Sequence, residues 1–294
     1  MKVRTMLETI TSLLGTPACA IPLSCCRPAK AYLLDRAGIP LTGTAILFAV
    51  PYLMTEDVEN PHRNLSLYAV SRDYHGYMQS LSDEMLPRLR EAFPASVFAL
   101  FADHSPICEV DAAARAGLGV LGANGLLLTP AFGSFVFLGE VVTDAPYEAV
   151  TGSARPEFPE RPPLCEGCGA CLRACPTGCV GSSDRRACLS AVTQRKGALS
   201  PEEVSALVQN GLVWGCDGCQ LVCPHNRRII DRGQDTPIPY FREERILRVD
   251  TDGLDAMADE VFSARAYAWR GRGVIRRNTE LFTNHSSKDE RSTP

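Results

Sequence analysis

The stretch from Cys165 to Pro176, CEGCGACLRACP, places four cysteines at intervals of two, two and three residues and closes with proline. Three closely spaced thiolates can hold one [4Fe–4S] cubane, while the fourth, separated by the longer step and the proline, reaches a second cluster. Zinc ribbons use cysteine pairs that are separated along the chain, not one continuous run of four. The stretch therefore predicts iron–sulfur ligation.

A second motif follows at Cys216, Cys219 and Cys223, which with Pro224 spells C-x2-C-x3-C-P. It lacks a leading cysteine, and Cys188 is the obvious candidate to complete a set of eight thiolates, enough for two [4Fe–4S] clusters. The crossed ligation of ferredoxins then predicts two sets of ligands. The first set is Cys165, Cys168, Cys171 and Cys223, and the second is Cys175, Cys188, Cys216 and Cys219.

The remaining composition is that of a globular protein. The chain has 294 residues, 45% hydrophobic and 22% charged, which suits one large domain or two ordinary ones. Its net charge of −4 excludes a chain-wide basic nucleic-acid binder. No apolar run approaches the ~20 residues of a membrane span, and the N-terminus lacks a signal-peptide pattern. We therefore expect a cytoplasmic protein whose 13 cysteines stay reduced. The cysteines without a ligand spacing are interpreted as ordinary thiols: Cys19, Cys25, Cys26, Cys108 and Cys179.

Cysteine and proline distribution divide the chain into four parts. Residues 1–150 form a front domain, 151–163 (TGSARPEFPERPP) a proline-rich linker, 164–230 a ferredoxin-like double-cluster module, and 231–294 a tail that is partly helical with a disordered end. Hydrophobic patterning in the front domain predicts an α+β fold of α/β-like character. The expected strands are 44–52, 95–101, 126–128 and 135–142, and the expected helices are 74–89, with Pro87 kinking or ending it, and 111–116.

Two features of the front domain point to chemistry. Asp103 follows the apolar run 95–102, at the C-terminal end of a predicted strand, where α/β sheets commonly bind ligands. A carboxyl backed by that run could have a raised pKa and donate a proton, although a turn or helix cap explains it equally well. Gly117, Gly119 and Gly122 spell G-x-G-x-x-G, but a helix precedes them and a strand follows, the reverse of the dinucleotide fingerprint. We interpret them as a tight turn that could pass close to a bulky ligand.

Together these motifs resemble the epoxyqueuosine reductase family, over about residues 40 to 230. The resemblance lies in YAVSRDYH at 68–75, Asp103 followed by AGLGVLGANGLLL at 116–128, GSFVFLGEVVTD at 133–144, and the two cysteine motifs. It implies a cobalamin-dependent oxidoreductase that reduces epoxyqueuosine in tRNA to queuosine, with electrons passing through both clusters to cobalamin. It also implies that Asp103 is the catalytic proton donor, and that Arg72, Asp103, Ser190 and Asp217 lie near the cobalamin.

The resemblance further implies an external electron donor, such as a ferredoxin or flavodoxin, and tRNA as a partner. Family members continue into a helical HEAT-like domain, whereas 64 residues follow Ile230 here, so we expect a shortened paralogue. The segment 265–277, RAYAWRGRGVIRR, offers five arginines for phosphate contact, or equally a solvated helix face. Two alternatives stay open: the same cofactors acting on a small molecule, as in reductive dehalogenation, or a ferredoxin-like electron carrier without cobalamin.

Overall fold

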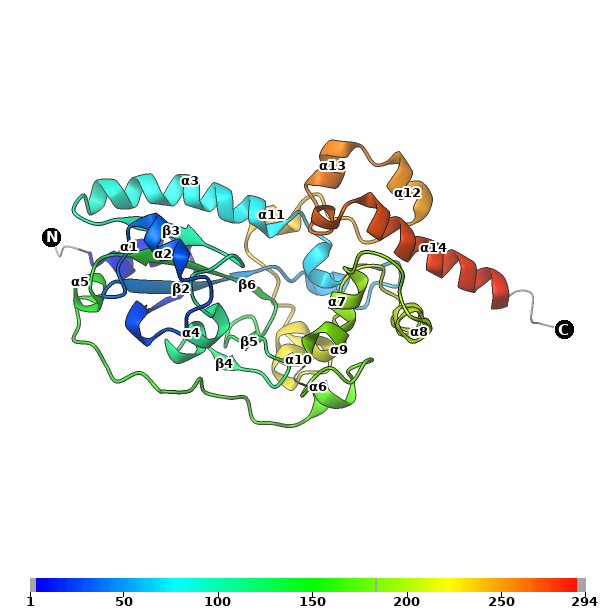
Figure 1. The fold of residues 1–294 in the computed structure, drawn as a ribbon, viewed down its shortest axis with the longest axis horizontal. Coiled ribbons are helices and arrows are strands. Elements are labelled where there is room, and N and C mark those ends of the chain that lie inside the picture. The colour runs from blue at the N-terminus through cyan, green and yellow to red at the C-terminus, as the bar shows by residue number, and fades with distance from the viewer. Residues whose placement is uncertain (1–3, 183, 290–294) are drawn as a thin grey trace. The chain divides into compact units, whose positions relative to one another are not determined.

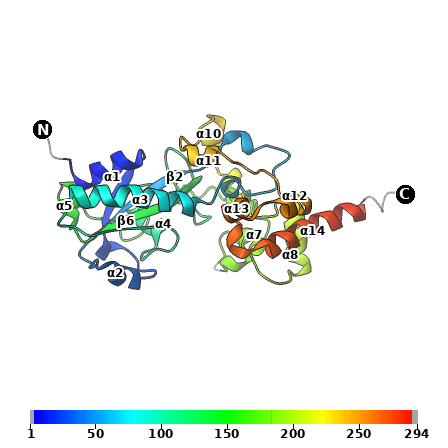
Figure 2. The ribbon, with the colours of Figure 1, turned by 90° about the horizontal axis from the view of Figure 1, so that it is seen from above.

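The computed structural model describes residues 4–182 and 184–289, and the chain divides into two compact units (Figures 1 and 2). Unit 1 contains Met1–Pro51 and His75–Gly167, and unit 2 contains Tyr52–Tyr74 and Cys168–Pro294. Sequence patterning had assigned residues 52–74 to the front domain. They fold with unit 2 because Leu65 and Val70 share a buried core there with Trp214 and Tyr267. The same core takes up the segment after residue 231, which is therefore part of a folded unit and not an appended tail.

Unit 1 is built on a four-stranded sheet in the order β1-β2-β6-β3, with every neighbouring pair antiparallel. The strands are β1 Ala18–Pro22, β2 Thr44–Pro51, β6 Val136–Thr143 and β3 Phe98–Phe101. Every residue of β2 is buried, as its continuous apolar run predicts. The mixed helix and strand content is confirmed, and the antiparallel order of the sheet agrees with the α+β class rather than with its expected α/β-like character.

Two helices flank this sheet, α3 on one side and α4 on the other (Figures 1 and 2). The helix α3 (Tyr74–Ala92) buries Met78, Met85 and Leu89 and runs on through Pro87. Pro87 does not end it because its exposed position leaves the carbonyl that loses a partner accessible to water. The remaining elements of unit 1 are α1 Met6–Leu14, η1 Leu23–Cys25, α2 Tyr32–Ala37, α4 Glu109–Arg115, β4 Val120–Leu121, β5 Leu127–Leu128 and α5 Tyr147–Thr151.

Strand β3 is shorter than predicted. The Ser96 N–H donates to the Phe93 carbonyl in a turn that closes α3, so the strand begins only at Phe98. The expected helix at 111–116 is confirmed as α4, and the short strand at 126–128 as β5.

Unit 2 consists mainly of short helices. They are η2 Thr55–Asp57, η3 Leu67–Ala69, α6 Ala170–Arg173, η4 Arg185–Ala187, α7 Leu189–Thr193, α8 Pro201–Asn210, α9 Gly218–Leu221, α10 Pro224–Asp231, α11 Pro239–Arg242, α12 Thr251–Ala256, α13 Asp259–Ser263, η5 Ala268–Arg270 and α14 Arg272–Asp289. The end of the chain, 284–294, was predicted to be disordered. It is helical as far as Asp289, and residues 290–294 lie outside the described residues.

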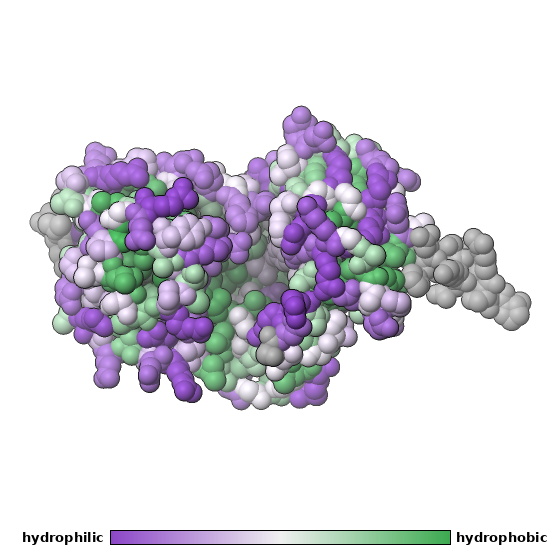
Figure 3. All heavy atoms as spheres, viewed as in Figure 1, coloured by the Kyte–Doolittle hydropathy of each residue, from purple (hydrophilic) through white to green (hydrophobic). Residues whose placement is uncertain are grey.

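Hydrophilic residues cover much of the face shown in Figure 3, and hydrophobic residues are exposed in patches among them. Within the described part of the chain, no helix combines the length and the hydropathy needed to cross a bilayer.

Candidate iron–sulfur centres and active site

The first cysteine run begins on unit 1. The Cys165 N–H donates to the Leu121 carbonyl at 3.0 Å, and the Leu121 N–H donates to the Pro163 carbonyl at 2.7 Å. The proline-rich segment therefore ends as an extension of the β4–β5 hairpin. Gly167 and Gly169 then take φ values of 69° and 73°, so the chain turns sharply before and after Cys168. Such turns allow successive thiols to approach a single centre.

The second motif lies in unit 2 beside Cys188. Burial raises the pKa of the Cys216 thiol to about 12, and the nearby charges of Asp217, Cys219 and Cys188 raise it further. Cys188 thus lies close enough to Cys216 to interact with it electrostatically, although 27 intervening residues separate the two in the sequence. This neighbourhood agrees with the predicted role of Cys188 as the missing ligand of the C-x2-C-x3-C-P motif.

Cys175 has an environment that favours thiolate. Burial by itself would raise the pKa of this thiol, but backbone hydrogen bonds from Val180, Thr177 and Cys179 lower it overall. Iron binds thiolate, and hydrogen bonds to the sulfurs tune the potential of a cluster. Cys179 itself is 2% exposed and its thiol donates to the Asp184 carbonyl at 3.6 Å, so its interpretation as a small buried residue is confirmed.

All thirteen cysteines are free thiols. Among the described residues, no group of three or more His, Cys, Asp or Glu side chains is already gathered in metal-binding geometry. The donor set nevertheless fits [4Fe–4S] clusters, because eight thiols stand at ferredoxin spacings and Cys175 is held toward its thiolate form.

Asp103 lies two residues beyond β3 in a strained backbone conformation. Its φ is 61°, a left-handed value that non-glycine residues rarely take and that concentrates at functional sites. Its N–H donates to Glu109 Oε1 at 3.0 Å, and its Oδ2 lies 3.9 Å from His75 Nε2.

The side chain of Asp103 is 74% exposed, so the expected partial burial against Phe98 and Phe101 is wrong. The argument from ligand sites of α/β sheets also fails, because β3 runs antiparallel to its neighbour β6. What singles out Asp103 is its backbone conformation, together with Glu109, which the sequence patterns did not identify.

The glycine motif is confirmed as a tight turn. It follows α4 and leads into β4, so the order of elements excludes the dinucleotide fingerprint here. A Cβ on Gly119 would lie 2.4 Å from the Leu128 carbonyl oxygen, and one on Gly122 would lie 2.5 Å from Asn124 Oδ1. The packing of the β4–β5 hairpin itself therefore requires glycine at 119, where the neighbour is backbone, whereas at 122 the Asn124 side chain would have to move.

Arg72, in unit 2, has an unusual environment. Its guanidinium lies 4.2 Å from the centre of the Tyr240 ring, and Nη1 lies 3.6 Å from Glu244 Oε1. Its Nε is buried and has no hydrogen-bond partner among the described residues. A buried N–H without an acceptor is costly, so this atom fits a ligand that brings one.

Unlike Arg72 Nε, the buried carboxylate of Asp217 has hydrogen-bond partners. It is 2% exposed and accepts hydrogen bonds from Arg63 Nη1 at 2.6 Å, the Ser66 hydroxyl at 2.5 Å and the Leu67 N–H at 3.1 Å. Its carboxylate therefore joins the 63–67 loop to α9. Ser190, in α7, is half-buried and accepts from Gln194 Nε2 at 3.3 Å.

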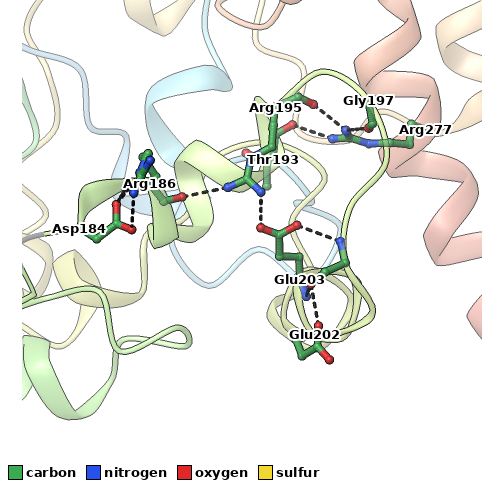
Figure 4. A network of polar contacts seen from close by, with 9 residues as sticks. Asp184, Arg186, Thr193, Arg195, Gly197, Glu202, Glu203 and Arg277 are labelled. Atoms are coloured by element: carbon green, nitrogen blue, oxygen red, sulfur yellow. Dashed lines mark hydrogen bonds and ion pairs between the residues drawn. The ribbon is translucent and has the colours of Figure 1, made fainter.

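Four of the five arginines in 265–277 bind the protein itself. Arg265, 3% exposed, donates to the Glu244 carbonyl, and Arg277 donates to the carbonyls of Arg195 and Gly197 (Figure 4). Arg272 donates to the carbonyls of Leu254 and Met257, and Arg276 pairs with Asp255. Neither a phosphate-binding row nor a solvated face describes Arg265, Arg272 and Arg277, whereas Arg276 forms an ion pair at the surface. The fifth, Arg270, stacks at 3.7 Å on Trp269, whose side chain is 60% exposed.

The cysteine motifs and the fold around them define a class, the double-cluster iron–sulfur proteins. Residues 164–226 match the family model described as a 4Fe-4S double cluster binding domain.

The relatives whose similarity extends beyond this domain are epoxyqueuosine reductases. The enzyme of Listeria monocytogenes is 33% identical over 234 residues, which cover 76% of this chain and 57% of that protein. The solved structure from Streptococcus thermophilus has a TM-score of 0.70 at 21% identity and covers 98% of this chain and 85% of its own. Another epoxyqueuosine reductase, solved with an epoxyqueuosine-modified tRNA-Tyr stem loop, has a TM-score of 0.69 at 24% identity and covers 95% and 80%. The predicted resemblance is confirmed, and the chain spans about half the length of the curated relatives it matches.

Proposed function

We propose that this protein is an oxidoreductase that reduces epoxyqueuosine in tRNA to queuosine, with two [4Fe–4S] clusters and cobalamin as cofactors. One observation carries the proposal: identity of 33% to an epoxyqueuosine reductase extends over 76% of the chain, more than either unit contains. Similarity to an electron carrier alone would end with the cluster domain. The tRNA-bound neighbour supports tRNA as the substrate.

In this proposal the front domain of residues 1–150, without the segment 52–74 that folds with unit 2, supplies the cobalamin- and substrate-binding domain. Residues 151–163 supply the linker and 164–230 hold the clusters. Removing an epoxide oxygen as water, so that a carbon–carbon double bond remains, consumes two electrons and two protons. An external one-electron donor of the ferredoxin or flavodoxin kind delivers the electrons through clusters held by the two predicted cysteine sets. Thiolate-ligated clusters persist where thiols stay reduced, which places the reaction in the cytoplasm.

Cobalamin, when bound, supplies a strongly reducing metal centre at which the epoxide is opened. Arg72 offers its unsatisfied buried Nε to an acceptor on that cofactor, such as a corrin amide oxygen. Ser190 contributes a half-buried hydroxyl. Asp217, whose oxygens already accept from three residues, contributes by fixing the loop at 63–67 rather than by direct contact.

Asp103 holds the proton for the oxygen that leaves the epoxide. Its left-handed backbone orients the carboxyl group, and its exposed side chain can take a new proton from water after each turnover. Asp103→Asn keeps the size of the side chain and removes the acid, so we expect cofactor content to stay unchanged and turnover to fall by at least about a hundredfold. Unchanged turnover would remove Asp103 from the mechanism.

The test of the whole proposal is anaerobic purification, followed by iron, sulfide and cobalt analysis and by turnover of an epoxyqueuosine-containing tRNA stem loop. We expect about eight iron atoms per chain, a base-off spectrum on adding cobalamin, and queuosine as the product. Eight iron atoms without a cobalamin spectrum would identify an electron carrier. A cobalamin spectrum without tRNA turnover would favour reduction of a small molecule.

A further inference from the structure

A buried pair of carboxyl groups lies beneath the Asp103 loop in unit 1. Glu140, in β6, is 0% exposed and is paired in the sheet with Phe101 of β3. Glu109, at the start of α4, is half-buried and lies close enough to Glu140 that its charge raises the pKa of the Glu140 carboxyl group. The Ser105 hydroxyl donates to Glu140 Oε1, and the Ile107 N–H donates to Ser105 Oγ at 3.1 Å. The pair is thus tied to the same loop that carries Asp103.

The geometry of this pair requires a proton. Two carboxylates in contact cannot both be ionised in a buried site. Glu140 Oε2 is buried and has no hydrogen-bond partner among the described residues, so it is the oxygen of the pair on which a proton relieves an unscreened negative charge. Burial, followed by the charge of Glu109, raises the pKa of Glu140 well above its ordinary value. Burial also raises the pKa of Glu109, but the pKa of the fully buried Glu140 is raised well above its ordinary value, so we assign the proton to Glu140 and the charge to Glu109.

The carboxylate of Glu109 also reaches Asp103. It accepts the Asp103 N–H at 3.0 Å, and this residue has the unfavourable φ of 61°. A hydrogen bond from a backbone N–H to a charged acceptor is among the stronger ones available to a loop. Three groups therefore form a chain: the Glu140 O–H, the Glu109 carboxylate and the Asp103 N–H.

We propose that Glu109 is a positioning residue for Asp103, and that the proton shared between Glu109 and Glu140 keeps Glu109 in place. The inference rests on the proposed role of Asp103 as proton donor. When the pair loses its proton, two negative charges face each other in a buried site. Repulsion then drives the half-buried Glu109 toward solvent and releases the Asp103 N–H.

Other charged groups around the pair already have partners. On the Glu109 side, Lys30 Nζ lies 2.8 Å from His104 Nδ1, and the Asp103 carboxylate adds a like charge. On the Glu140 side, Arg115 lies 3.5 Å from Asp111, while the Cys26 thiol has a pKa raised to about 12, chiefly by burial. In the neighbouring strand β2, Leu47 stands opposite Glu140 in the register.

Hydrogen–deuterium exchange of the segment 102–106 tests the inference without any turnover. Rates are compared with an unstructured peptide of the same sequence at each pH. In the wild type we expect protection at neutral pH that falls about tenfold as the pH rises through the pKa of Glu140. Glu140→Gln donates to Glu109 and accepts from Ser105, so it should stay protected at every pH. Glu109→Ala should lose the protection at every pH, whereas Glu109→Gln, which keeps an acceptor, should retain it.

Circular dichroism and thermal melts verify that each variant is folded. Should Glu109→Ala fail to fold, the near-isosteric Glu140→Gln variant is sufficient for the test. If the exchange protection of Glu140→Gln fell with pH as much as that of the wild type, the inference would be overturned. Unchanged protection in folded Glu109→Ala would also overturn it. An infrared band of a protonated carboxylic acid, present in the wild type and absent in Glu140→Gln, is the second expected result, and its absence from the wild type would contradict the shared proton.

Asp103→Asn separates this inference from the proposed function. The variant keeps the backbone N–H, so its exchange protection should match that of the wild type while its turnover is lost. Full turnover with unchanged protection would overturn the role of Asp103 as proton donor and leave the Glu109–Glu140 geometry intact.

Discussion

At the scale of single residues, Asp217 shows how a position next to a predicted ligand can serve the fold. Its carboxylate is 2% exposed and lies 2.6 Å from Arg63, whose side chain is 8% exposed. Asp217→Ala would leave a buried guanidinium without its counter-charge. We expect the free energy of unfolding to fall by about 3–5 kcal/mol, measured by denaturant titration.

Asp184 provides the matched control. It also pairs with an arginine, Arg186 at 2.9 Å, but the two side chains are 49% and 88% exposed (Figure 4). Exposed pairs contribute little because water screens them. Asp184 also accepts the Arg186 N–H at the start of η4, so Asp184→Ala should lower the free energy of unfolding slightly, and far less than Asp217→Ala does. Equal losses in both variants would contradict the distinction.

At the scale of elements, local sequence patterns correctly predicted those helices and strands whose conformation depends mainly on the residues within them. The uniform apolar run predicted β2, the spacing of Met85 and Leu89 predicted α3, and the spacing of Cys216 and Cys219 predicted the second ligand motif. These signals succeed because period and spacing are properties of neighbouring residues.

Features that depend on distant segments could not be predicted in this way. The segment 52–74 folds with unit 2 because Leu65 packs against Trp214, a partner far along the chain. Asp103 was recognised as a candidate, but its support by Glu109 depends on the conformation of the loop that leads from β3 into α4, which no pattern in the sequence predicts. Arg265, Arg272 and Arg277 were misread because backbone carbonyls, which carry no sequence signal, are their partners.

The same segment yields a prediction for the short helix η5. Trp269 is 60% exposed with Arg270 stacked on it at 3.7 Å, an arrangement that can stack on an unpaired base. Stacking of one base contributes about 1–3 kcal/mol. Trp269→Ala should therefore weaken binding of the tRNA stem loop at least fivefold, measured by fluorescence anisotropy, while iron content stays constant. Trp269→Phe keeps an aromatic face and should bind nearly as the wild type does, whereas equal affinity of all three proteins would exclude this surface.

At the scale of the whole molecule, the proposed function requires electrons to pass through both clusters, so the number of bound clusters should control turnover. Cys188 is the proposed ligand that spacing alone did not supply, and its proximity to Cys216 supports it. Cys188→Ala should lower the iron content from about eight to about four atoms per chain and abolish turnover.

Cys179→Ala is the matched control. The Cys179 thiol also belongs to unit 2, but the residue is only 2% exposed and its thiol donates to a backbone carbonyl. It should keep about eight iron atoms and its activity. Iron analysis and electron paramagnetic resonance of the reduced proteins measure both. Full iron content in Cys188→Ala would show that the second cluster has another fourth ligand. Loss of one cluster with turnover intact would mean that electrons reach the reaction through a single centre, so that the second cluster stores charge or stabilises the fold.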